Sequence, residues 1–171
     1  MPELSPPVES LVRLPLDMIK GTWPTTEDDR HRFYERLGLR QVEWDSSAVD
    51  RQEDERTVSH RFETPLVSVD GIDTMFRGEF LGLSLFAYNE AGDDGVKSRT
   101  AYPLLKDAIS LRLGSPVEEW GTAREPACFW TTGELQLEMY CFQRLASGVM
   151  LGPSHAERSA ANDREAADAQ P

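Results

Sequence analysis

The sequence has few residues of the types that carry most protein chemistry. It contains two cysteines and three histidines in 171 residues. None of His31, His60 and His155 is spaced from a Cys, Asp, Glu or second His as metal ligands are, so we expect no metal site. It also lacks a glycine loop followed by Lys-Ser or Lys-Thr, and a Gly-x-Gly-x-x-Gly after a predicted strand. These absences predict a protein without a cofactor.

Long apolar runs are missing as well. No segment approaches the roughly 18 consecutive apolar residues of a membrane span, and the start of the chain lacks the basic and apolar regions of a signal peptide. We therefore expect a cytoplasmic protein that does not bind membranes. Cys128 and Cys141 flank a hairpin turn predicted at Thr132-Gly133. That turn would set Cys128 opposite about residue 137, so two free thiols are the simpler interpretation.

Acidic residues, by contrast, are abundant. The chain carries 30 Asp and Glu against 18 Lys and Arg, a net charge of −12 and a pI of about 4.7. Such a surface repels nucleic acids and would attract a basic partner, although acidity can also serve solubility alone. Apolar residues make up 39% of the chain, which is typical of a folded domain and argues against general disorder.

The first half predicts an arm, a helix and three strands. Residues 1–22 are proline-rich and hold an apolar stretch interrupted by Pro15, so we expect an extended or briefly helical arm packed on the body. A helix follows Trp23-Pro24, where Thr25 or Thr26 can cap its start and Gly38 can end it. Alternating apolar residues then predict strands, at residues 39–44, 57–63 and 80–88.

The second half repeats this order. A helix is predicted at residues 99–113, with Pro103 tolerated if it lies in the first turn. Three strands follow, at residues 127–131, 134–142 and 149–151. Residues 153–171 lack large apolar side chains and are expected to form a flexible or frayed helical tail.

A nearly identical sequence motif occurs at the ends of both predicted helices. It consists of Arg36-Leu37-Gly38 with Glu43-Trp44 in the first half, and of Arg112-Leu113-Gly114 with Glu119-Trp120 in the second. The chain therefore predicts an α+β fold of two αβββ-like halves, residues 25–90 and 99–152, with antiparallel sheet covered by helices. Residues 23–152 are expected to form a single domain. Coincidence is the alternative, since Leu-Gly commonly ends helices.

No catalytic arrangement stands out. Ser84 lies in a predicted strand without the glycines of a nucleophile elbow, and both cysteines lie in strands, far from the loop or helix end of an activated thiol. His60 shares a strand face with apolar residues, so we expect a buried, hydrogen-bonded histidine. The 30 carboxylates allow a small hydrolase with a carboxylate pair as an alternative, but the sequence favours a protein that is not an enzyme.

Surface features suit protein binding instead. Acidic residues gather in two predicted loops, residues 45–56 and 92–95, where a partner could meet them. Trp23, beside Pro24, is the tryptophan most expected to be exposed, whereas Trp44 and Trp120 are expected in the core. The candidate partner-binding residues are Trp23, Asp45, Asp50, Glu53, Asp54, Glu55, Asp93 and Asp94.

The pattern of Trp23, Asp28-Asp29, Leu37-Gly38, Leu113-Gly114-Ser115-Pro116, Phe129-Trp130 and the hairpin of residues 135–151 resembles small actinobacterial proteins of uncharacterised and immunity type. Those are associated with polymorphic or type VII-secreted toxins. The resemblance covers roughly residues 20–152, and its motifs carry no chemistry, so it transfers no site residues. The order of elements is also similar to that of the secretion-chaperone-like fold.

The resemblance implies an immunity protein that binds a cognate toxin and occludes its active site without catalysis of its own. A nuclease or NAD-cleaving toxin would present a basic mouth to such an acidic protein, since its substrates carry phosphates. The alternative is a secretion-chaperone-like protein that binds an unfolded segment of an exported partner. An exposed apolar patch on the sheet would favour that alternative.

Overall fold

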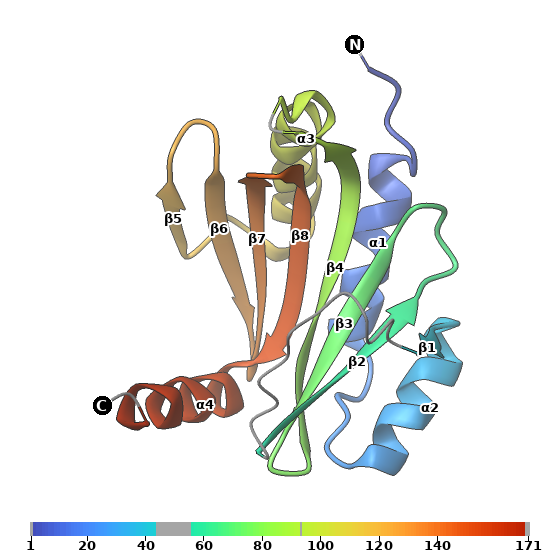
Figure 1. Cartoon of the computed structure of the whole chain (residues 1–171), viewed down its shortest axis with the longest axis vertical. Helices are drawn as coiled ribbons and strands as arrows, with labels where there is room; N and C mark the ends of the chain where they lie inside the picture. Colours follow the sequence, from blue (N-terminus) through green and yellow to red (C-terminus); the bar gives the residue numbers. More distant parts are fainter. Residues whose placement is uncertain (1, 44–55, 93, 170–171) are drawn as a thin grey trace.

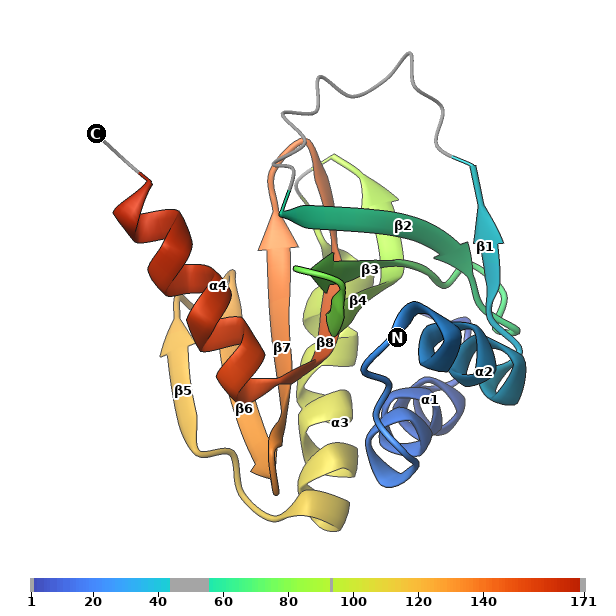
Figure 2. The same ribbon diagram turned by 90° about the horizontal axis from the view of Figure 1, so that it is seen from below.

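The computed structural model describes residues 2–43, 56–92 and 94–169. One eight-stranded antiparallel sheet forms the middle of the molecule, with three helices packed on one face and a fourth at the end of the other (Figures 1 and 2). The α+β fold class is therefore confirmed. The helices are α1 (Val8–Lys20), α2 (Glu27–Leu37), α3 (Val96–Leu113) and α4 (Ala156–Asp168). The strands are β1 (Arg40–Val42), β2 (Thr57–Glu63), β3 (Asp70–Phe76), β4 (Glu79–Ala91), β5 (Glu118–Gly121), β6 (Pro126–Thr132), β7 (Leu135–Gln143) and β8 (Ala146–His155).

The strand order is β1-β2-β3-β4-β8-β7-β6-β5. Each half contributes a helix followed by a meander that runs from one edge of the sheet to its centre, where β4 pairs with β8. Counted from either edge toward the centre, the strands follow in chain order, β1 to β4 on one side and β5 to β8 on the other. A repeated unit would give this order. Each half has four strands where the sequence predicted three, because β3 and the short edge strand β5 were not predicted.

The Arg-Leu-Gly part of the repeated motif ends a helix in both halves. Gly38 ends α2 with φ 66°, and Gly114 ends α3 with φ 85°, both in the range that favours glycine. Each helix then leads to an edge strand, β1 or β5. The Arg-Leu-Gly part of the motif therefore ends a helix ahead of an edge strand in each half.

Three boundaries differ from the prediction. The segment predicted as an arm contains helix α1, which continues through Pro15 and buries seven residues, so it is part of the core. Helix α3 begins at Val96, which places Pro103 in its interior instead of its first turn. Strand β8 extends to His155, past the predicted start of the tail, and α4 follows it directly.

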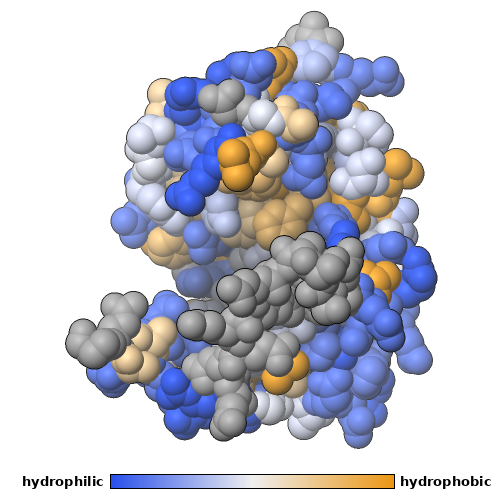
Figure 3. All heavy atoms as spheres, in the orientation of Figure 1, coloured by the Kyte–Doolittle hydropathy of each residue, from blue (hydrophilic) through white to orange (hydrophobic). Residues whose placement is uncertain are grey.

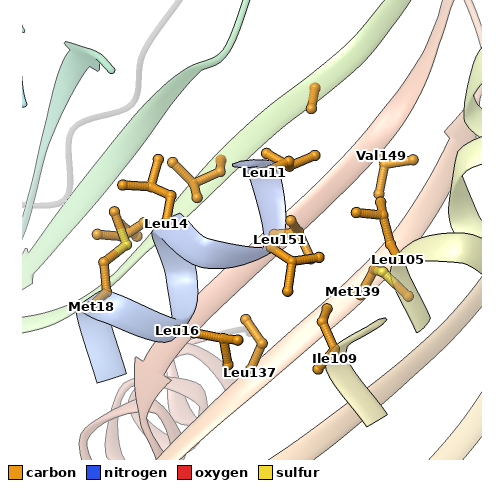
Figure 4. Close-up of a cluster of buried hydrophobic side chains, with 14 of the residues drawn as sticks. Leu11, Leu14, Leu16, Met18, Leu105, Ile109, Leu137, Met139, Val149 and Leu151 are labelled. Atoms are coloured by element: carbon orange, nitrogen blue, oxygen red, sulfur yellow. The ribbon is translucent and has the colours of Figure 1, made fainter. Parts of the chain in front are cut away.

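The core lies between the sheet and the helices α1 and α3. Figure 4 shows side chains of α1 and α3 meeting those of β7 and β8, among them Leu11, Leu16, Leu105, Ile109, Leu137, Met139, Val149 and Leu151. All of these are at most 2% exposed. Helices α1–α3 therefore cover one face of the sheet, and α4 lies at one end of the opposite face.

Candidate binding face

The face of the sheet opposite α1–α3 carries a concentration of aromatic side chains. Cross-strand pairing brings Trp120, Ala127, Tyr140, Met150 and Phe86 into one row across β5, β6, β7, β8 and β4. Partners in a pair project to the same side, so these side chains share a face. With Phe129 and Phe142, which project to the same side, they form what we call the aromatic face. Figure 3 shows hydrophobic residues among hydrophilic ones over the upper part of this side.

The rings contact one another in pairs. Ring centroids lie 6.1 Å apart for Trp120 and Phe129, 6.3 Å for Phe86 and Phe142, and 6.4 Å for Tyr140 and Phe142. Gly148 pairs with Phe142 across β7 and β8, and a Cβ on Gly148 would lie 2.6 Å from Cζ of the Phe142 ring. This glycine therefore lets the Phe142 ring lie over β8.

Trp120 is the most exposed of these rings. It keeps 43% of its surface accessible, so the prediction that it packs in the core was wrong. The reason is its place on β5, the edge strand, where all four residues are exposed. Large aromatic side chains that stay accessible are the residues that most often dominate protein interfaces.

A hollow of about 550 Å³ opens between these rings. Trp120, Tyr140 and Phe142 form its aromatic sides, and the small side chain of Ala127 leaves room between Trp120 and Tyr140. Glu138 and Arg144 also line the hollow. It is an open recess with aromatic walls and charged groups.

Glu138 is the half-buried acid of this face. Its neighbours across the sheet are Phe129 on β6 and Gly152 on β8, and it lines both the hollow and a second recess of about 180 Å³. Burial, followed by the charge of Asp163 on α4, raises the pKa of the Glu138 carboxyl. Within the described part of the chain this carboxyl forms no hydrogen bond or ion pair.

Helix α4 lies at one end of the same face (Figures 1 and 2). None of its residues is buried, and Arg158 anchors it. The Arg158 guanidinium donates hydrogen bonds to the carbonyl oxygens of Pro24 at 3.0 Å and Phe80 at 2.7 Å. Glu165 adds ion pairs with Arg56 and Arg77. Polar contacts therefore hold this helix in place.

A buried polar cluster lies on the other face, under α2. Asp73 on β3 is fully buried, and its carboxylate accepts hydrogen bonds from Arg30 at 3.0 Å and Tyr34 at 2.5 Å. His60 Nδ1 lies 2.7 Å from the same carboxylate, which confirms the hydrogen-bonded histidine predicted from the sequence. The cluster joins α2 to β2 and β3.

The pKa shifts in this cluster follow from burial and charge. Burial disfavours the Arg30 guanidinium, but its hydrogen bond to Glu27 and the charge of Asp73 outweigh burial and raise the pKa of Arg30. Burial and the Asp73 carboxylate raise the pKa of Tyr34. Neither Asp73 nor His60 lines the hollow on the aromatic face or the smaller recess beside Glu138. These side chains tie α2 to the sheet.

Neither of the two predicted binding residues that the structure describes, Trp23 and Asp94, is among the residues of the aromatic face or its hollow. Trp23 is half-buried against Phe33 and Phe80, with ring centroids 5.8 Å and 5.3 Å away, so it is a core residue more than an exposed anchor. Asp94 is exposed in the loop before α3. The remaining candidates lie outside the described residues, namely Asp45, Asp50, Glu53, Asp54, Glu55 and Asp93, as does Trp44.

Other kinds of site have no counterpart among the residues described. There, no three His, Cys, Asp or Glu side chains gather in a group that could hold a metal ion. Over the same residues, no helix has the length and hydrophobicity needed to cross a bilayer. Cys128 and Cys141 are buried and free, and burial raises the pKa of Cys141 to about 12. Buried thiols of this kind are poor nucleophiles.

Comparison of the chain with protein-family models, curated proteins and solved structures finds no match.

Proposed function

We propose that this chain is an immunity-type inhibitor that binds a basic toxin domain through the aromatic face and blocks the toxin's active site. The aromatic face is the observation that carries the proposal. It presents accessible rings on a rigid sheet, and rings of this kind supply most of the binding energy in many protein interfaces. The inhibitor has no catalytic role of its own.

The charge of the chain supports a basic partner. The net charge is −12, and Glu118 pairs across the sheet with Phe129, so it borders the aromatic rings on the same side. Glu125 and Glu138 line the hollow itself, together with Arg144. Acidic groups around aromatic anchors speed the approach of a basic protein and favour it over acidic partners.

A secretion-chaperone-like function is the second candidate. The aromatic character of the face favours it, and so does β5, an exposed edge strand beside that face on which an extended segment could add a further strand. In that case the partner is an unfolded segment of an exported protein. The two candidates differ in the folded state of what is bound.

The test is co-expression of this chain, carrying an affinity tag, with the product of the adjacent gene. The immunity proposal expects a stable complex and expects added inhibitor to abolish the toxin's nuclease or NAD-cleaving activity at about equimolar ratio. The absence of a complex, together with unchanged activity, would refute it. Binding to an N-terminal or unfolded segment of the partner, with the activity of its folded domain unchanged, would establish the chaperone function instead.

A further inference from the structure

The hollow on the aromatic face has the composition of a site for an organic cation. Trp120 and Tyr140 stand on either side of Ala127, and their π faces carry the partial negative charge that attracts cations. Glu138 adds a full negative charge to the same recess. A neutral ligand would gain little from the carboxylate, and an anionic ligand would be repelled by the carboxylate and by the ring faces. The combination therefore favours a cation.

The Glu138 carboxyl has lost part of its hydration without gaining a partner among the described residues. It is half-buried between Phe129 and Gly152, and none of the described residues pairs with it. Glu125 also lines the hollow but is already engaged, because its Oε1 accepts a hydrogen bond from the backbone N–H of Gln143 at 3.1 Å. The group left to receive a ligand is thus Glu138. A cation there would compensate for the cost of burying this carboxylate.

We propose that the hollow binds an arginine side chain of the protein partner, with the guanidinium hydrogen-bonded to Glu138 and stacked against Trp120 or Tyr140. This identifies the anchor of the interface and, for the partner's identity, rests on the proposed function. Arginine fits better than lysine, because its planar guanidinium can stack on a ring and donate two hydrogen bonds to one carboxylate.

Arg144 has a defined effect in this arrangement. It lines the hollow from the end of β7 and is exposed, so its charge opposes the entry of a second guanidinium. Replacing it with alanine should therefore strengthen arginine binding. The same substitution would weaken binding if Arg144 instead helped to hold an anionic ligand.

The probe is N-acetylarginine amide, titrated into the purified chain and followed by NMR of the Trp120 indole N–H and the Glu138 carboxyl carbon. We expect saturable shifts at both groups, with weaker binding of N-acetyllysine amide. Glu138→Gln should weaken binding about tenfold or more, and Trp120→Ala a few-fold. Glu35→Gln is the matched control, because Glu35 is exposed on α2 in the opposite layer and loses the same charge.

The outcomes separate this inference from the proposed function. If Glu138→Gln binds the arginine probe as well as the unchanged chain does, or if N-acetylglutamine amide binds equally well, the arginine site is refuted. That result stands whether or not a toxin partner is found. Conversely, if the probe binds at Glu138 but co-expression yields no complex and the toxin activity is unchanged, the arginine site stands and the inhibitor function is refuted.

Discussion

Asp73→Ala should be the most damaging single substitution in the polar part of this fold. The variant removes the carboxylate that accepts hydrogen bonds from Arg30 and Tyr34 and contacts His60, all under α2. Arg30 is 1% exposed, so its guanidinium stays buried with one carboxylate fewer. Loss of one partner of a buried ion pair costs about 3–5 kcal/mol. That is a large fraction of the stability of a typical domain, about 5–15 kcal/mol.

Urea unfolding, followed by circular dichroism, measures the loss. Asp70→Ala is the control, because Asp70 is on the same strand but its ion pair with Arg61 is 38–45% exposed, where about 0–1 kcal/mol is expected. Equal losses for the two variants would refute the interpretation of the cluster as a buried, cooperative network. If Asp73→Ala does not fold, Asp73→Asn, which keeps an acceptor for Tyr34, should still lose more than Asp70→Ala.

Three further predictions concern the acid of the aromatic face, the anchor of α4 and the thiols. Burial and Asp163 raise the pKa of Glu138, so its contribution to stability is greatest below the unfolded pKa of about 4.3 and is lost as pH rises through the folded pKa. Glu138→Gln should therefore stabilise the protein at neutral pH, with a difference that shrinks in acid, and a pH-independent difference in urea titrations would argue against this. Arg158→Ala should accelerate hydrogen exchange across α4 more than Arg164→Ala does, because Arg158 holds the helix by two carbonyl contacts; equal acceleration in both variants would contradict its role as anchor. Iodoacetamide should label the buried thiol of Cys141 only after unfolding, as measured by mass spectrometry, and rapid labelling of the folded chain would disprove its burial.

The elements that the sequence predicted well are those with a strong local pattern. Strand β7 has a buried apolar residue at every second position from Leu135 to Cys141, and α2 has a capping threonine and a terminal glycine that match the structure. The elements that were missed lack such patterns. Asp70, Gly71 and Asp73 interrupt the alternation of β3, and the four residues of β5 are all exposed. Their strand conformation comes from pairing with neighbours, which is not a local property.

The buried cluster did leave one sign in the sequence. Arg30 stands at helical spacing with Phe33, Tyr34 and Leu37, on the face of α2 that packs inward, and a charge at such a position calls for a buried partner. That the partner is Asp73 depends on a strand 43 residues away. A helical periodicity can therefore indicate that a partner exists but cannot identify it.

The aromatic face could not be predicted from the sequence for a similar reason. Tyr140 and Phe142 alternate with the inward residues of β7, so their outward direction follows from the sequence. Trp120 and Phe86 join them only because β5 and β4 lie on either side in the strand order. The sequence instead favoured binding by the acidic loops of residues 45–56 and 92–95, and that placement stays a prediction.

The central claim, that this chain binds a protein partner through the aromatic face, is tested most directly by placing the same charge on each side of the molecule. Trp120→Arg puts a cation on the aromatic face, and Leu111→Arg puts one on α3, where Leu111 is 85% exposed. Isothermal titration calorimetry against the co-purified partner should show binding abolished by Trp120→Arg and unchanged by Leu111→Arg. The claim would be contradicted if the Trp120→Arg variant bound the partner as tightly as the unchanged chain does, or if only the Leu111→Arg variant lost binding.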